Sequence, residues 1–165
     1  MTERAANAST SRQTALTLVH RALRWVFLVG LVGLEVELFL LKHTDGVWQV
    51  VPLVLLGGGL AVLAWYAATR SMLSARTLQG MMWLYVASGF AGTLLHFKGN
   101  VAYEKESNPG LSARELYRGA VQGSTPTLAP GAMIQLGLLG LIVVFSGNRL
   151  RDAASEATLV IQQHK

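Results

Sequence analysis

The segment 26–41 limits the fold more than any other part of this chain, because it is an apolar, helix-length stretch that contains two glutamates. Its sequence is VFLVGLVGLEVELFLL, with Glu35 and Glu37 in the second half. About 20 apolar residues cross a bilayer as a helix, since hydrocarbon requires every backbone hydrogen bond to be made within the segment. A carboxylate in that setting is costly and needs a partner, a proton or a water-filled cavity. We therefore expect both acids to have a structural or functional role.

Three further apolar stretches indicate an integral membrane protein. Only 14% of the residues are charged, compared with about 25% in ordinary soluble domains. The four expected spans cover residues 22–42, 47–69, 79–97 and 127–147. Tryptophans stand near the ends of the first three spans, as in an interfacial aromatic belt, at positions 25, 48, 65 and 83. The sequence thus predicts an all-α integral membrane protein, with an antiparallel four-transmembrane-helix bundle over residues 21–147.

The distribution of basic residues predicts the orientation of these spans. If residues 1–20 face the cytoplasm, nine of the 14 lysines and arginines lie inside: Arg4, Arg12, Arg21, Arg24, Arg70, Arg76, Arg149, Arg151 and Lys165. Since cytoplasmic segments carry the basic excess, we expect a multi-pass protein of a bacterial-type inner membrane with both termini cytoplasmic. Residues 1–20 are expected to be a largely disordered tail, and residues 148–165 a second cytoplasmic tail. The first span has no small-residue cleavage site, so we interpret it as a retained helix.

Composition also excludes several classes of function. The net charge of +5 does not indicate a nucleic-acid partner, since no basic run is long enough to follow a phosphate backbone. Contact of Arg21, Arg24, Arg70 and Arg76 with anionic lipid headgroups is the simpler interpretation. The absence of cysteine excludes disulfides and cysteine-ligated metals. No hydrolase, metalloprotease or phosphate-loop motif is present, which favours a function other than catalysis.

The outer loop, residues 98–126, is long enough to have structure of its own. Asn108-Pro109-Gly110 predicts a turn, and Ser112 with Glu115 matches the capping box of a helix start. The expected helix ends at Gly123 and has one apolar face, made of Leu116, Tyr117, Ala120 and Val121. It is either a lid or docking surface over the helix ends, or an interfacial helix whose apolar face lies on lipid or on the bundle.

Glycines within the spans predict closely packed helices and, with them, the position of the two acids. Small residues let membrane helices approach one another. Glu37 lies four residues after Gly33 and seven after Gly30, so all three are expected on one buried face of the first helix. Glu35 lies about 200° around the helix from Glu37, and we expect it either to be the less buried of the two or to reach a second neighbouring helix near Gln135. By depth, Glu35 is level with Gln135 and Glu37 with Thr93, which are the expected polar neighbours.

Two histidines, His43 and His96, stand at the outer ends of their helices and leave three chemistries open. A metal site could use His96, His43 and one of Glu37 or Glu104, a nitrogen and oxygen set suited to zinc, copper or iron. A b-type haem could use His43 and His96 as paired axial ligands. A proton path could use Glu35, Glu37 and His96. The alternative is structural: Glu37 bonds to a neighbouring helix, and both histidines are solvated at the interface.

The hypothesis that best fits these features is a small inner-membrane protein that is a subunit or accessory factor of a larger membrane complex. Its helix faces and outer loop would contact other membrane-protein subunits or a second copy, with lipid around the remainder. Metal or haem binding at the outer face and proton or small-solute transport through Glu35 and Glu37 are the alternatives. The sequence assigns no role to His20 or His164.

Overall fold

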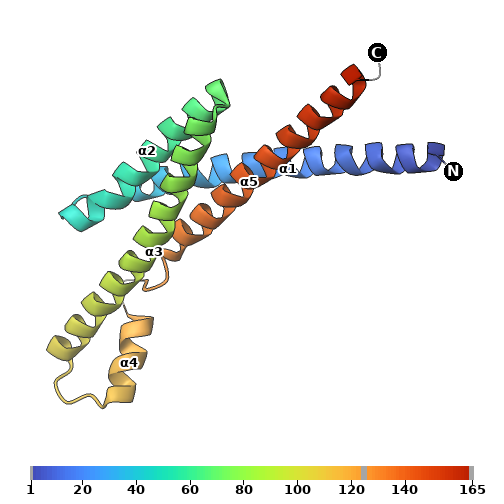
Figure 1. The fold of residues 1–165 in the computed structure, drawn as a ribbon. Coiled ribbons are helices and arrows are strands. Elements are labelled where there is room, and N and C mark those ends of the chain that lie inside the picture. The colour runs from blue at the N-terminus through green and yellow to red at the C-terminus, as the bar shows by residue number, and fades with distance from the viewer. Residues whose placement is uncertain (1, 124–125, 164–165) are drawn as a thin grey trace.

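The structure is a computed structural model that describes residues 2–123 and 126–163; His164 and Lys165 fall outside these ranges. In the described residues it has five helices and no strands (Figure 1). The helices are α1 (Thr2–Leu40), α2 (Val47–Thr69), α3 (Met72–Ser107), α4 (Ala113–Gln122) and α5 (Gly131–Gln163). The prediction of an all-helical chain is therefore confirmed.

Two of the helices are long and apolar enough to cross a membrane. They are α2, over Val47–Thr69, and the Gly131–Arg151 part of α5. The other two long helices carry more polar groups within their apolar parts: Arg24, Glu35 and Glu37 in α1, and Gln79 and His96 among those of α3. Length and composition thus identify two of the four expected spans.

The long helices pack against one another around one apolar core. Helix α1 contacts α2 and α5, α3 contacts the same two helices, and α4 packs on α3. Fully buried side chains come from each long helix, including Leu31, Leu56, Met82 and Val144. Glycine permits the close approach of α3 to α5, because a Cβ on Gly137 would lie 2.7 Å from the carbonyl oxygen of Met82.

The outside of this assembly is also strongly apolar. Large hydrophobic side chains are exposed on α1, α2, α3 and α5, for example Phe39 (73%), Val47 (80%), Phe90 (58%) and Phe145 (55%). A soluble monomer rarely exposes contiguous apolar patches beyond a few hundred Å². Any function proposed for this chain has to account for that surface.

The ends of the helices differ most from the expected boundaries in three places. Helix α1 begins at Thr2, where a disordered tail was predicted, and α5 continues to Gln163 through the expected C-terminal tail. Helix α3 continues past the expected end at residue 97 to Ser107. The apolar length of a segment limits how much of it fits in hydrocarbon, but it does not end a helix. The first strong stop signal after residue 97 is Asn108-Pro109-Gly110, and α3 ends directly before it.

The short helix α4 has the predicted start and end. The Ser112 hydroxyl accepts a hydrogen bond from the Glu115 backbone N–H, and the Ser112 backbone N–H donates to Glu115 Oε2 at 2.9 Å, so the capping box is complete. The helix ends at Gln122, before Gly123. Ala120 is fully buried, whereas Tyr117 and Val121 of the predicted apolar face are exposed. Together with the outer part of α3, α4 projects away from the other helices (Figure 1). It therefore lies beside α3 and not over the helix ends.

Candidate functional site

Glu35 and Glu37 of α1 point in directions opposite to those predicted. Glu37 is exposed, and Glu35 is the partly buried one. The residues of α1 that face the core are Phe27 and Leu31, with Leu34 and Leu38 packed against it. Their spacing of four, three and four residues is that of a helix-packing stripe. The prediction that Glu37 is buried is wrong because this bulky stripe, and not the pair Gly30 and Gly33, defines the contact face.

The surroundings of Gly30 and Gly33 explain the error. A Cβ on Gly30 would lie 2.9 Å from a Leu136 side-chain carbon of α5, so Gly30 is a packing glycine. A Cβ on Gly33 would meet nothing within 4 Å. Glu37, one helical turn after Gly33, shares that open side of α1. Only one of the two glycines therefore belongs to an interface within the chain.

Glu35 is directed at the glycine triplet of α2. Its Oε1 lies 3.6 Å from the position of a Cβ on Gly57. Its Oε2 is buried and has no hydrogen-bond partner within the structure. Buried polar atoms are nearly always hydrogen-bonded in folded proteins. Glu35 is therefore an acid held between α1 and α2 with one oxygen left free for a proton, a water molecule or a ligand.

A tyrosine that the sequence analysis did not single out fills the other side of the triplet. The Tyr85 side chain from α3 is fully buried, and its hydroxyl donates to the carbonyl oxygens of Leu55 (3.1 Å) and Leu56 (3.3 Å) in α2. A Cβ on Gly59 would overlap the Tyr85 hydroxyl and lie 2.7 Å from Cζ. The triplet thus admits Glu35 from one helix and Tyr85 from another. A tyrosine within an apolar span was the signal that could have identified this contact.

The expected polar neighbours of the acids have other roles. The Thr93 hydroxyl donates to the Gly89 carbonyl of its own helix at 2.9 Å. Gln135 is exposed on α5. Among the described residues no hydrogen bond joins Gln135 to Glu35 or Thr93 to Glu37, so the pairing by depth was wrong. Helix rotation, which depth does not specify, decides which residues at one level meet.

At the outer end, His43 and His96 are near enough for their charges to interact. Burial lowers the pKa of His43, the positive charge of His96 lowers it further, and Asp45 opposes both effects. His96 Nδ1 lies 3.0 Å from the Pro126 carbonyl oxygen, so this nitrogen carries the proton and donates. The pairing of His43 and His96 as haem ligands is not tested by these contacts and stays a prediction.

The expected metal site of His96 and His43 with Glu37 or Glu104 is not assembled among the described residues. Glu104 Oε2 accepts a hydrogen bond from Asn108 at 3.1 Å, and its side chain lies against Gly119 of α4. Glu37 is on the exposed side of α1. Among the residues that the structure describes, no three histidines or acids are grouped so as to hold a metal ion. His96, His43, Glu37 and Glu104 therefore do not form one donor set.

A buried polar cluster fixes the outer segment to α3. The Asn100 amide donates to the Ala120 carbonyl oxygen of α4 at 3.0 Å and to the Thr127 hydroxyl at 3.1 Å. The Thr127 hydroxyl also donates to the Ala120 carbonyl oxygen, at 2.9 Å. A Cβ on Gly123 would lie 2.7 Å from the Asn100 amide carbon, so this glycine makes room for the cluster. Three segments of the chain are thereby held together, and α4 is fixed against α3.

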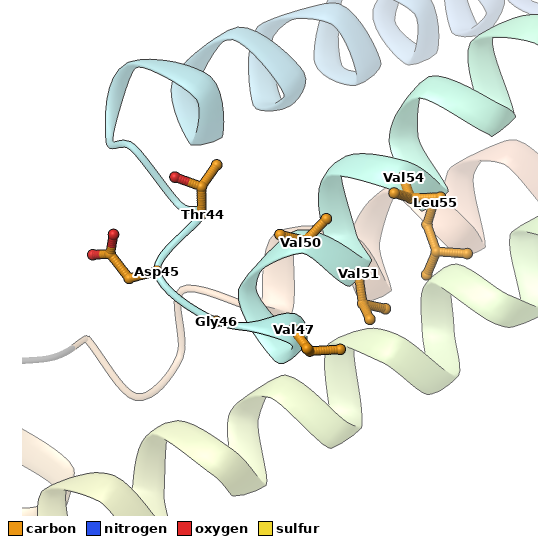
Figure 2. Close-up of a pocket in the computed structure, with 8 residues that line it drawn as sticks. All are labelled: Thr44, Asp45, Gly46, Val47, Val50, Val51, Val54 and Leu55. Carbon is orange, nitrogen blue, oxygen red and sulfur yellow. The ribbon is translucent and has the colours of Figure 1, made fainter.

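An open hollow of about 540 Å³ lies beside the turn between α1 and α2. Figure 2 shows it lined by Val47, Val50, Val51, Val54 and Leu55 of α2 and by Thr44, Asp45 and Gly46 of the turn. The Asp45 carboxylate points away from the helix (Figure 2). With four valines and a leucine among its eight lining residues, the hollow suits hydrocarbon and not a polar substrate.

Comparison with known protein families, with curated proteins and with solved structures found no match for this chain. Its function is therefore inferred from its own residues.

Proposed function

We propose that this chain is a multi-pass protein of a bacterial-type inner membrane that acts as a subunit or accessory factor of a larger membrane complex. In this proposal α1, α2, α3 and α5 each cross the bilayer as a four-helix bundle, and both termini are cytoplasmic. Two helices with membrane-spanning length and composition support it, as does the apolar surface over all four long helices. Lipid or a partner would cover that surface.

The observation that carries the proposal is the open side of α1. Glu37 is exposed there among large apolar neighbours, including Val29 (68% exposed), Val36 (50%) and Leu40 (76%). An ionised side chain facing hydrocarbon costs roughly 2.5–3.5 kcal/mol at mid-membrane on insertion scales. A hydrogen-bond donor from another helix would remove most of that cost. Gly33, which is open one turn earlier, would let a partner helix approach closely.

In this proposal a transmembrane helix of another subunit covers the open side of α1. That helix carries a hydrogen-bond donor opposite Glu37. A second copy of this chain is an alternative outcome of the same test. A third outcome is that Glu37 has no partner and reaches the solvated headgroups of the outer leaflet.

The test is native mass measurement of the chain extracted from its own membrane in mild detergent. We expect a species heavier than the monomer that is lost in Glu37→Leu and in Gly33→Leu and retained in Glu37→Gln. Gln135→Leu is the matched control, because it removes an exposed polar side chain from α5. Gly33→Leu should leave folding unchanged, since a Cβ there meets nothing within 4 Å. A lone wild-type monomer would contradict the proposal.

A second candidate function is proton handling at Glu35, which is favoured by its buried, unpartnered Oε2. Here Glu35 would bind and release a proton between α1 and α2. Purified chain in vesicles that contain a pH-sensitive dye would show proton flux that Glu35→Gln abolishes. An equal flux in wild type and Glu35→Gln would eliminate this function. An absorption spectrum and elemental analysis of the same preparation would test the haem and metal alternatives.

A further inference from the structure

The inner end of the molecule contains a cavity that none of these functions uses. Its volume is about 610 Å³, and it lies between α1 and α2 with Val143 of α5 at its wall. Helix α1 contributes polar groups on the cytoplasmic side, among them His20, Arg21 and Arg24. Farther along the chain, the same helix contributes the apolar side chains Phe27 and Leu28. The cavity therefore has a basic end and an apolar end.

The basic end contains two arginines with no carboxylate partner among the described residues. Arg21 and Arg24 are three residues apart, so they project from neighbouring positions on one side of α1. Leu28 follows Arg24 by one turn and continues the same side. The cavity thus has two guanidinium groups next to a path of hydrocarbon.

His20 is part of the wall, held in place by α5. Its Nδ1 lies 2.8 Å from the Ser146 hydroxyl, which itself donates to the Ile142 carbonyl oxygen. Since the single hydroxyl hydrogen is used there, Nδ1 carries a proton and donates to Ser146. Burial lowers the pKa of His20, and the positive charges of Arg24 and Arg70 lower it further. Arg21 and Arg24 thus supply the guanidinium groups of the cavity, beside a histidine whose charged form is disfavoured.

The apolar end continues along α2. Leu60, Leu63 and Ala64 line it at helical spacing, opposite Phe27 and Leu28 of α1. Phe27 is 1% exposed and belongs to the core, so this wall is fixed by packing. A ligand that fits both ends has an anionic head and at least one long hydrocarbon chain. A free phosphate ion would use only the basic end.

We propose that this cavity binds one anionic phospholipid of the cytoplasmic leaflet, with its phosphate on Arg21 and Arg24 and an acyl chain between α1 and α2. The inference rests on the membrane insertion contained in the proposed function, but not on any partner subunit. Basic pockets between helices on the cytoplasmic side are a known way to hold anionic lipid headgroups. The site differs from diffuse attraction to a charged surface because the hydrocarbon end limits it to one place.

Trp25 provides a local probe, because it lines the same cavity. A chain with Trp48→Phe, Trp65→Phe and Trp83→Phe keeps Trp25 as its one tryptophan. The three replaced side chains are all exposed, so the fold should tolerate their loss. Quenching of Trp25 is then compared between brominated phosphatidylglycerol and brominated phosphatidylcholine with the same acyl chains, in the full chain reconstituted into nanodiscs.

We expect phosphatidylglycerol to quench at a lower concentration than phosphatidylcholine, with the preference falling about fivefold for each of Arg21→Gln and Arg24→Gln. Ala64→Phe fills the apolar end without adding a second tryptophan to the fluorescence signal. It should weaken the quenching of Trp25 by both lipids. Arg76→Gln is the control, since Arg76 is an exposed basic residue of α3 that does not line the cavity.

Equal quenching by the two lipids, in the chain whose one tryptophan is Trp25, would overturn the proposal. A loss of lipid preference in Arg76→Gln as large as that in Arg24→Gln would also overturn it. Competition by inorganic phosphate at the strength of phosphatidylglycerol would show a headgroup site without a lipid chain. Gly33→Leu separates this inference from the proposed function, because it should abolish assembly and leave the lipid preference unchanged. Failure to enter nanodiscs would instead refute the membrane insertion on which both depend.

Discussion

The glycine triplet of α2 allows a sharp stability prediction, because its three members have different surroundings. A Cβ on Gly57 would lie 3.6 Å from Glu35 Oε1, and one on Gly58 would lie 3.5 Å from the Met81 terminal methyl. Both are ordinary contacts. A Cβ on Gly59 would overlap the Tyr85 hydroxyl. Alanine is therefore compatible with the first two positions and incompatible with the third.

The expected magnitudes follow from these contacts. Overpacking of a close-packed site costs about 1–3 kcal/mol, and loss of the Tyr85 hydrogen bond adds about 0.6 kcal/mol in a membrane setting. The higher helix propensity of alanine offsets up to about 1 kcal/mol of this destabilisation. Gly59→Ala should thus lower the free energy of unfolding by about 1–3 kcal/mol. Gly57→Ala and Gly58→Ala should be neutral or stabilising by up to about 1 kcal/mol.

The assay is unfolding in mixed detergent micelles, followed by tryptophan fluorescence and helical circular dichroism. A double-mutant cycle with Tyr85→Phe identifies the cause, since removing the hydroxyl removes the closest overlap. The double variant Gly59→Ala, Tyr85→Phe should be more stable than the sum of its single effects predicts, by about 1 kcal/mol. Equal stabilities for the three alanine variants, or strict additivity with Tyr85→Phe, would refute this packing of α3 on α2.

Three further predictions concern the outer face. Asn100→Ala should destabilise by about 1–3 kcal/mol, because it removes the two buried hydrogen bonds that the amide donates to the Ala120 carbonyl oxygen and the Thr127 hydroxyl, and faster hydrogen exchange in α4 would report it. The pKa of His43 should be below its ordinary value in an NMR titration and should rise in His96→Gln, because His96 contributes to lowering it; an unchanged titration would contradict the proximity of the two rings. As a histidine with a lowered pKa, His43 contributes stability at neutral pH that decreases as the pH falls below 6.5. Ser112→Ala should fray the first turn of α4. Since bonding to Ser112 lowers the pKa of Glu115, acidification through that lowered pKa should produce the same fraying. Hydrogen exchange that is unaffected by either change would contradict the capping box.

Local signals in the sequence predicted part of this structure closely. Helix α2 has the bounds expected from the sequence, because the Asp45-Gly46 turn precedes it and Arg70, in a left-handed conformation, ends it. The start of α4 was predicted because a capping box is formed by residues three positions apart. Each of these features depends on neighbours along the chain.

The features that were missed depend on how one helix is rotated against another. Glycine spacing placed Glu37 in an interface, whereas the Phe27, Leu31, Leu34 and Leu38 stripe turns Glu35 inward. Tyr85 of α3 contacts Gly59 of α2, and no pattern within either helix predicts this contact. Rotation is decided by the sum of packing over all faces, which a single sequence specifies only weakly. The same reason left the inner cavity unpredicted.

The central claim, that the open side of α1 binds a partner in the membrane, is tested most directly by photo-crosslinking in intact membranes. A photoreactive residue would replace each position from 26 to 40 in turn. The account predicts adducts to a discrete protein at Val29, Gly33, Val36, Glu37 and Leu40, and none at the core-facing positions Phe27, Leu31, Leu34 and Leu38. Adducts spread evenly around the helix, or adducts to lipid alone at every position, would contradict it.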